Sequence, residues 1–154
     1  MKPVKKLLFP VDLSEVSPRI APWVLDLANT FDAEVHLVFV ARRFEQFSTV
    51  YVSPRSIEAF EQEISQGAER GLEEFVKAHF ESKGFTRCVR RVVLGDAAEE
   101  ILDYIRAENI DLVVMGTHGR KGLERVLFGS VADHVVKMST VPVLTVNPYR
   151  VDLS

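Results

Sequence analysis

The chain has 154 residues, a net charge of −3, an apolar share of 47% and a charged share of 27%. This length suits one domain with a sizeable core, which we expect to span residues 1–154, and the composition is that of an ordinary globular protein. The negative balance argues against non-specific attraction to nucleic acid or to an anionic membrane.

The sequence offers no sign of a membrane segment or of secretion. No apolar run approaches the about 20 residues that span a bilayer, and the apolar part of the start, MKPVKKLLFPVDLS, is too short for a signal peptide. Cys88 is the single cysteine, so an internal disulfide is excluded. Without a CxxC partner, Cys88 is interpreted as a packed residue rather than a nucleophile. We therefore expect a cytoplasmic protein.

Predicted strands and helices alternate along the chain. The strands are expected at residues 5–11, 34–41, 87–94, 112–115 and 143–146. The helices are expected at residues 16–31, 54–83, 97–108 and from Ser130 onward. This alternation predicts an α/β fold: a doubly wound parallel sheet with right-handed crossovers and helices on both faces.

The first strand leads to Asp12, at the carboxyl end of a strand that we place inside the sheet. Doubly wound sheets bind ligands at this end of their strands. A carboxylate there could accept hydrogen bonds from a ribose or help to hold a metal. Asp12 or Ser14 could instead cap the following helix, and capping is the favoured role for Ser14.

The connection at residues 42–52 follows an apolar and therefore interior second strand. It is too long for a simple turn and contains Phe44, Phe47 and Tyr51, so it is either a flap over a site or an ordered surface loop. Ser53 caps and Pro54 opens the long helix that comes next. Its apolar stripe is assigned to the core: Ile57, Phe60, Ile64, Ala68, Leu72, Phe75 and Val76.

The two edges of the sheet are predicted from charge. Residues 87–94 contain three arginines, which favours one edge, and Asp96 with Glu99 forms a capping box for the next helix. The strand at residues 143–146 is uncharged and is expected at the other edge, which must be covered. A second copy, antiparallel across a two-fold axis, would cover it and form a homodimer. The alternative is a monomer whose tail, NPYRVDLS, shields the edge.

A glycine-rich loop at residues 116–129 follows the strand at residues 112–115. Glycines let backbone N–H groups approach a ligand closely, and a helix beginning near Ser130 adds unpaired N–H donors and a positive dipole end. This combination is typical of a phosphate site. The alternative is that the glycines only end a strand and a helix, and that Ser130 is an ordinary cap.

The spacing of these glycines separates the loop from two common phosphate motifs. Neither GxGxxG nor GxxxxGK[ST] occurs. The pattern present is G-x2-G-x9-G-S, formed by Gly116, Gly119, Gly129 and Ser130. Together with the flanking VVMGTHG and GSVADHVVKMSTVPVL, it resembles the ATP-binding signature of the universal stress protein family.

The resemblance covers about residues 4–147 and carries expectations about fold and ligand. It implies a Rossmann-like, five-stranded parallel sheet in the order 3-2-1-4-5, with ATP in the crevice between the ends of the first and fourth strands. Magnesium or manganese would be held mainly through the phosphates. Homodimer formation through Val143–Val146 is also a property of this family.

The family pattern assigns roles by position. Adenine and ribose would be flanked by Pro10, Val11 and Asp12, and Val40 would wall the base, although plain core packing explains Val40 equally well. Met115 and Gly116 would lie on the ribose side. The phosphates would be bound by Gly119, Gly129, Ser130 and Val131.

Charged and titratable residues near the loop are weaker candidates. Arg120, Lys121 and Arg125 could neutralise phosphate, but such residues are usually solvated, and we expect one contact at most. His118 has no partner visible in the sequence. The histidines, at positions 36, 79, 118 and 134, lack metal-ligand spacing, so no structural metal site is expected.

Catalytic signatures are missing from the sequence. There is no GxSxG and no nucleophile–base pair, and FPVDLS stands where the related ATP pyrophosphatases carry an SGGxDS-like loop. The first hypothesis is a homodimeric ATP-binding stress or signalling protein with at most slow hydrolysis. The second is a magnesium-dependent ATP hydrolase or phosphotransfer enzyme using Asp12. The third, a nucleotide-free dimerisation module, conflicts with the intact glycine signature.

Overall fold

The computed structural model describes residues 2–43, 51–118 and 129–150. Five strands in these ranges form one parallel sheet in the order β3-β2-β1-β4-β5. They are β1 (Lys6–Pro10), β2 (Glu34–Ala41), β3 (Cys88–Leu94), β4 (Leu112–Gly116) and β5 (Val143–Val146). The expected parallel sheet and its strand order are confirmed, with charged β3 and apolar β5 at opposite edges.

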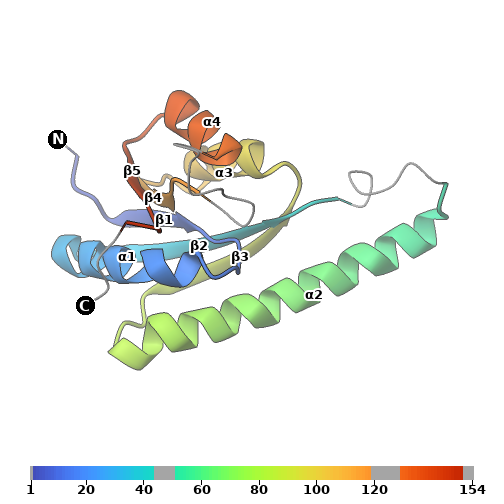
Figure 1. The fold of residues 1–154 in the computed structure, drawn as a ribbon, viewed down its shortest axis with the longest axis horizontal. Coiled ribbons are helices and arrows are strands. Elements are labelled where there is room, and N and C mark those ends of the chain that lie inside the picture. The colour runs from blue at the N-terminus through green and yellow to red at the C-terminus, as the bar shows by residue number, and fades with distance from the viewer. Residues whose placement is uncertain (1, 44–50, 119–128, 151–154) are drawn as a thin grey trace.

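Helices cover both faces of this sheet (Figure 1). They are α1 (Ser17–Phe31), α2 (Pro54–His79), α3 (Ala97–Ala107) and α4 (Ser130–Met138), with a short 3-10 turn, η2 (Glu81–Lys83), after α2. Alternate strand residues point to opposite faces. In β1, Leu7 and Phe9 therefore join the core under α1 and α2, whereas Leu8 joins the core under α3 and α4.

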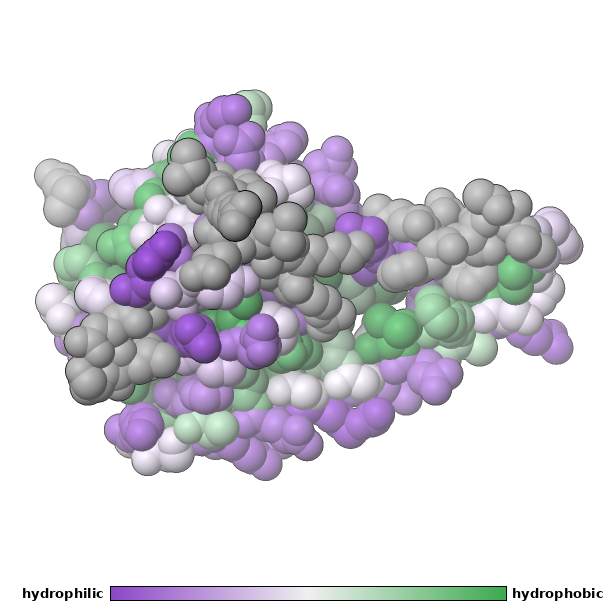
Figure 2. All heavy atoms as spheres, viewed as in Figure 1, coloured by the Kyte–Doolittle hydropathy of each residue, from purple (hydrophilic) through white to green (hydrophobic). Residues whose placement is uncertain are grey.

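The long helix α2 differs from its prediction in its core contacts and at its carboxyl end. Its buried residues are Ala68, Leu72, Phe75 and Val76, while Ile64 is 37% exposed. The core assignment of Ile57, Phe60 and Ile64 is thus wrong. At 26 residues α2 is about 39 Å long, whereas the seven residues of β3 span about 23 Å. The amino half of α2 therefore projects beyond the sheet (Figure 1), and Figure 2 shows apolar side chains on it.

The carboxyl end of α2 comes earlier than residue 83, where the sequence predicted it. Phe80 leaves the helical conformation with φ −126°, and its side chain is fully buried. Gly84, with φ 82°, then closes the 3-10 turn. The predicted starts are correct, because Ser53 accepts from the N–H of Ser56 at 3.3 Å and Asp96 from the N–H of Glu99 at 3.1 Å.

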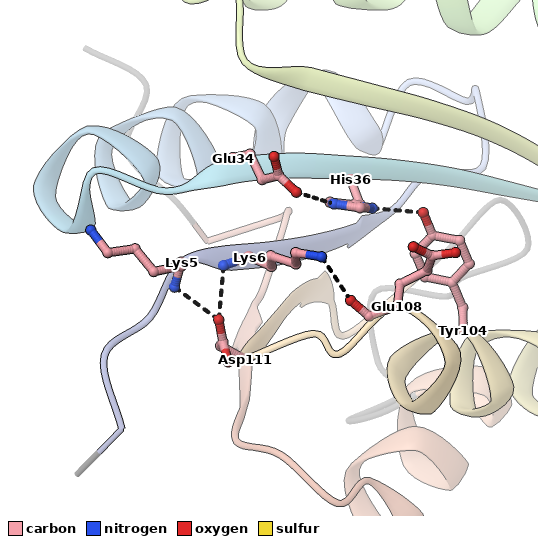
Figure 3. A network of polar contacts seen from close by, with 7 residues as sticks. All are labelled: Lys5, Lys6, Glu34, His36, Tyr104, Glu108 and Asp111. Atoms are coloured by element: carbon pink, nitrogen blue, oxygen red, sulfur yellow. Dashed lines mark hydrogen bonds and ion pairs between the residues drawn. The ribbon is translucent and has the colours of Figure 1, made fainter.

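A buried carboxylate ties the starts of β1 and β4 together (Figure 3). Asp111 Oδ2 accepts from the N–H groups of Lys5 and Lys6 at 2.9 and 3.0 Å, and Oδ1 lies 2.8 Å from Lys2 Nζ. Burial raises the pKa of Asp111, but the hydrogen bonds from these three residues outweigh burial, and the pKa is lowered overall. Asp111 therefore stabilises the fold as a carboxylate.

A second polar group lies inside the core, between β2 and α3 (Figure 3). His36 is 3% exposed, with Nδ1 2.7 Å from Tyr104 Oη and Nε2 2.8 Å from Glu34 Oε1. Burial raises the pKa of Tyr104, so its phenol stays protonated and can donate to Nδ1. Both ring nitrogens of His36 thus have hydrogen-bond partners.

The first prediction concerns Asp111→Asn. At neutral pH the variant should lose about 1–3 kcal/mol of unfolding free energy, because a buried charged hydrogen-bond acceptor is removed. A carboxyl group whose pKa is lowered by folding stabilises the fold fully at pH values above its unfolded pKa of about 3.9. This stabilisation is lost as the pH falls through the pKa of the folded state. The difference from the unmodified protein, measured by urea unfolding, should therefore shrink as the pH falls below the unfolded value. Exposed Asp103→Asn is the control, and a difference that does not change with pH contradicts the assignment.

The second prediction concerns Tyr104→Phe. Loss of the hydroxyl leaves buried His36 Nδ1 without this donor and should cost about 1–3 kcal/mol in urea unfolding. Tyr51→Phe is the matched control, because Tyr51 is 89% exposed, and it should unfold like the unmodified protein. Equal stability of the two variants would rule out a structural role for this hydrogen bond.

Candidate functional site

The carboxyl ends of β1 and β4 lie next to each other in the middle of the sheet. Helix α1, which follows β1 in the sequence, lies on one face of the sheet, and α4, which follows β4, lies on the other face (Figure 1). Strand order reverses at this point, and such switch points form the binding crevice of open α/β sheets. The predicted ligand residues come from these two strand ends and from β2 and α4.

Three of the predicted residues gather on the α3/α4 side of the sheet. Val40, Met115 and Val131 pack in or against the same apolar cluster there, and Met115 is 5% exposed. Half-buried Pro10 ends β1 opposite Val38. These side chains come from three strands and a helix, and they could supply an apolar wall for a flat ring.

Val11 does not join that wall. Its side chain is 5% exposed and belongs to the cluster under α1 and α2, on the opposite face. Its N–H donates to Val38 O at 2.9 Å. The Val11 side chain therefore serves the core, and a ligand in the crevice could meet this residue only through its main chain.

Asp12 is held firmly in the loop after β1. Its Oδ1 accepts three hydrogen bonds, from Ser14 N–H at 3.0 Å, Ser14 Oγ at 2.6 Å and Ser17 Oγ at 2.9 Å. Between Asp12 and Ser14, Leu13 adopts φ 58°, a left-handed conformation that costs a non-glycine residue about 1–2 kcal/mol. The loop thus fixes a carboxylate at the carboxyl edge at some conformational cost, which is common at functional sites.

The predicted capping role of Ser14 is wrong. The N-cap of α1 is Val16, which contributes no side-chain bond. Ser14 Oγ accepts from the N–H of Val16 at 3.2 Å and donates to Asp12, so the hydroxyl stabilises the loop. Pattern reading placed the cap too early because the tight Asp12 loop takes up these residues before the helix begins.

Gly116 has a packing reason to be glycine. A Cβ there would lie 2.6 Å from Ile20 Cδ1 and 3.0 Å from His118 O. A side chain at this position would require Ile20 to shift and would crowd the backbone of His118, so close packing favours glycine here with or without a ligand. Gly119, and with it Arg120, Lys121 and Arg125, lies outside the described residues.

The start of α4 has no side-chain cap. Gly129 is the N-cap and makes no such bond, so Ser130 is the first helical residue and its predicted alternative role as an ordinary cap is wrong. The Gly129 N–H donates to Thr117 O at 2.6 Å. The first bond of the helix itself is donated by the Asp133 N–H to Gly129 O, at 2.9 Å. The N–H groups of residues 130–132 thus precede the first intrahelical bond, as donors at a positive dipole end.

His118 is buried and has partners that the sequence did not reveal. It is 3% exposed, its Nδ1 lies 2.7 Å from Thr117 Oγ1, and its ring meets the Tyr149 ring edge-on at 5.3 Å. Tyr149 lies far away in the sequence, so no spacing rule connects the two rings. The partners of His118 therefore become visible only in the folded structure.

Two further findings concern metals and membranes. Within residues 2–43, 51–118 and 129–150, no three His, Cys, Asp or Glu side chains come together as a metal site would require. In the same ranges, every helix is too short or too polar to cross a bilayer.

Comparisons with known proteins agree with this architecture. Residues 3–147 match the universal stress protein family. Universal stress protein MJ0531 of Methanocaldococcus jannaschii is 35% identical over 149 residues, which covers 92% of this chain and 81% of the relative. Universal stress protein MJ0577 of the same organism is 32% identical over 154 residues, covering 92% of this chain and 94% of the relative.

Solved structures show the same fold. The structure of MJ0577 superposes with a TM-score of 0.81 at 29% identity, covering 95% of this chain and 97% of that one. An Arabidopsis thaliana family member with AMP bound gives a TM-score of 0.63 at 22% identity, covering 93% of this chain and 91% of that one. The universal stress protein of Archaeoglobus fulgidus in complex with dAMP gives a TM-score of 0.64 at 16% identity, covering 94% of this chain and 98% of that one.

The match therefore extends over almost every element of the sheet and its helices, at identities above 30% for two relatives. This chain belongs to the universal stress protein family.

Proposed function

We propose that the chain is an ATP-binding universal stress protein of the cytoplasm that acts as a homodimer in a stress response or in signalling. Its nucleotide state would alter its partners or its stability. The observation that carries the proposal is that two features follow the neighbouring strands of the switch point: the oriented carboxylate of Asp12 after β1 and the uncapped start of α4 after β4.

The adenine end of the ligand would lie on the α3/α4 side. Pro10, Val40 and Met115 would offer the apolar surface for the base, and the main chain of Val11 would lie beside it. The AMP and dAMP complexes of the two family members named above support an adenine nucleotide as the ligand class. Asp12 would accept hydrogen bonds from the ribose hydroxyls, since carboxylate oxygens are strong acceptors.

The phosphate end would lie at the start of α4, close to Gly116. Ser130 contributes an exposed hydroxyl and an N–H, and Val131 contributes an N–H. Helix N-termini bind phosphate because these donors and the helix dipole act together. Gly129 would act by its conformation, because its own N–H is bonded to Thr117 O. Gly119 completes the proposed set by its place in the signature.

A magnesium or manganese ion would accompany the phosphates. The described residues suit an ion held mainly by phosphate and water, because no three acidic or histidine side chains converge among them. When bound, the ion would neutralise phosphate charge. Asp12 is the carboxylate that this chain offers at the switch point.

The homodimer would form along β5. The N–H of Val113 donates to Pro142 O at 3.0 Å, and the N–H of Thr117 donates to Val146 O at 2.9 Å. Main-chain groups alternate in direction along a strand. Val143 and Thr145 therefore present their N–H and C=O groups to the open edge, where an antiparallel copy could pair with them.

The third prediction concerns ATP binding. Purified protein stripped of nucleotide should bind about one ATP per chain in a calorimetric titration with magnesium, as one switch point per domain implies. Ser130→Ala should raise the Kd about ten-fold, because a hydrogen bond to a charged group contributes about 1.5–3 kcal/mol. Phosphate release from the same samples would report any hydrolysis.

The matched control for that titration is Ser82→Ala, an exposed serine beyond α2 whose hydroxyl bonds Ala78 O. It should bind ATP like the unmodified protein. Absence of saturable binding in the unmodified protein would reject the nucleotide function, and equal affinities of both variants would reject the role of Ser130.

The fourth prediction concerns the dimer. Thr145→Pro removes an outward N–H from β5 without removing a bond to β4, and proline is tolerated on edge strands. The variant should fold and sediment as a monomer in analytical ultracentrifugation. Thr145→Val keeps the N–H and should remain a dimer. A dimer of unchanged affinity in Thr145→Pro would show that β5 is not the interface.

A further inference from the structure

The chain after β5 folds back as a compact turn, residues 147–150, which we name the C-terminal turn. Asn147 holds it from within, since its Oδ1 accepts from Tyr149 N–H at 3.0 Å and its C=O from Arg150 N–H at 3.2 Å. Arg19 on α1 donates from Nη1 to Pro148 O at 3.2 Å, and Pro148 is buried. The turn is thus fastened to α1.

The C-terminal turn also touches the segment that follows β4. The Tyr149 ring stands edge-on to the His118 ring, with centroids 5.3 Å apart and an interplanar angle of 67°. His118 is 3% exposed and its Nδ1 lies 2.7 Å from Thr117 Oγ1. The ring of Tyr149 therefore helps to hold His118 and Thr117 in place.

Thr117 links this contact to the start of α4. Its N–H donates to Val146 O at 2.9 Å, and its C=O accepts from the Gly129 N–H at 2.6 Å. Gly129 is the N-cap that precedes Ser130. A continuous set of contacts thus leads from Arg19 and Tyr149, through His118 and Thr117, to the N–H groups proposed to bind phosphate.

We infer that the C-terminal turn positions the phosphate end of the nucleotide site, with Tyr149 and Arg19 as positioning residues that need not touch the ligand. This inference rests on the proposed ATP function. Small displacements of donor groups weaken binding to a charged ligand, because such hydrogen bonds depend on distance and angle. Removal of the Tyr149 ring releases His118 and, through Thr117, the N-cap of α4.

The same contacts predict which part of the ligand is affected. The turn reaches the segment between β4 and α4, whereas the proposed adenine wall includes Pro10 and Val40 on β1 and β2. Loss of the turn should therefore weaken ATP binding and leave adenosine binding unchanged. General destabilisation of the domain would instead weaken the binding of ATP and of adenosine together.

The experiment compares calorimetric titrations of ATP with magnesium and of adenosine. Tyr149→Ala should raise the Kd for ATP about five-fold, since aromatic contacts of this kind have energies that correspond to two- to ten-fold, with no change for adenosine. Tyr149→Phe retains the ring and should keep ATP affinity close to normal. Arg19→Ala should resemble Tyr149→Ala, and Arg106→Ala, on the exposed side of α3, is the arginine control.

A second measurement uses the unmodified protein, so it does not depend on whether a variant folds. Linkage requires that, if the turn supports ATP binding, ATP also stabilises the turn. Hydrogen exchange of the Tyr149 and Arg150 amides, both bonded to Asn147, should slow on addition of ATP and magnesium but not of adenosine.

The outcomes distinguish failure of the proposed ATP function from failure of the positioning role of the C-terminal turn. No ATP binding by the unmodified protein would reject the proposed function together with this inference. ATP binding that is equal in the unmodified protein and Tyr149→Ala, or that falls in parallel with adenosine binding, would overturn the inference alone. Unchanged amide exchange in the ATP-saturated protein would overturn it as well.

Discussion

The parallel pairing of β1 with β4 is the interaction on which the rest of this structure depends. The two strands pair at Leu7 with Leu112 and at Leu8 with Val113, in the middle of the sheet. Because α1 lies on one face and α4 on the other, the carboxyl ends of these strands form a topological switch point, where open α/β sheets bind their ligands. Strands β2 and β5 then pair outward from this centre.

The two ends of the strands have opposite physical characters. At the amino end, the polar groups of Asp111 and His36 lie against donors or acceptors that satisfy them, and these bonds fix where β1, β2 and β4 start. At the carboxyl end, Leu13 adopts a costly left-handed conformation and α4 begins without a side-chain cap. Stability is concentrated at one end, and groups able to receive a ligand are concentrated at the other.

Much of the fold could be predicted from the sequence, because periodicity and charge report on local structure and burial. The bounds of β2 and β5 agree with prediction, and arginine-rich β3 lies at an edge. What failed depended on tertiary structure. The buried part of α2 is limited to residues from Ala68 onward, because the helix is longer than the strands it packs against. The contact of His118 with Tyr149 likewise joins residues that are far apart in the sequence.

The candidate site was predictable only in outline. The glycine and serine spacing identified the loop, but the occupied N–H of Gly129 and the core-facing side chain of Val11 follow from geometry that no spacing conveys. Gly116 illustrates the difficulty, because close packing against Ile20 and close approach to a phosphate would both favour glycine.

The projecting half of α2 has a consequence for how the molecule opens. All of the buried residues of α2 lie from Ala68 onward, so residues 54–67 receive little tertiary support from the sheet. An isolated helix shorter than about 12–15 residues is marginal in water. This half should therefore unwind at a small fraction of the global unfolding free energy, as a separate cooperative unit, while its carboxyl half stays folded on the sheet. A single continuous helix would then contain two segments of very different thermodynamic stability.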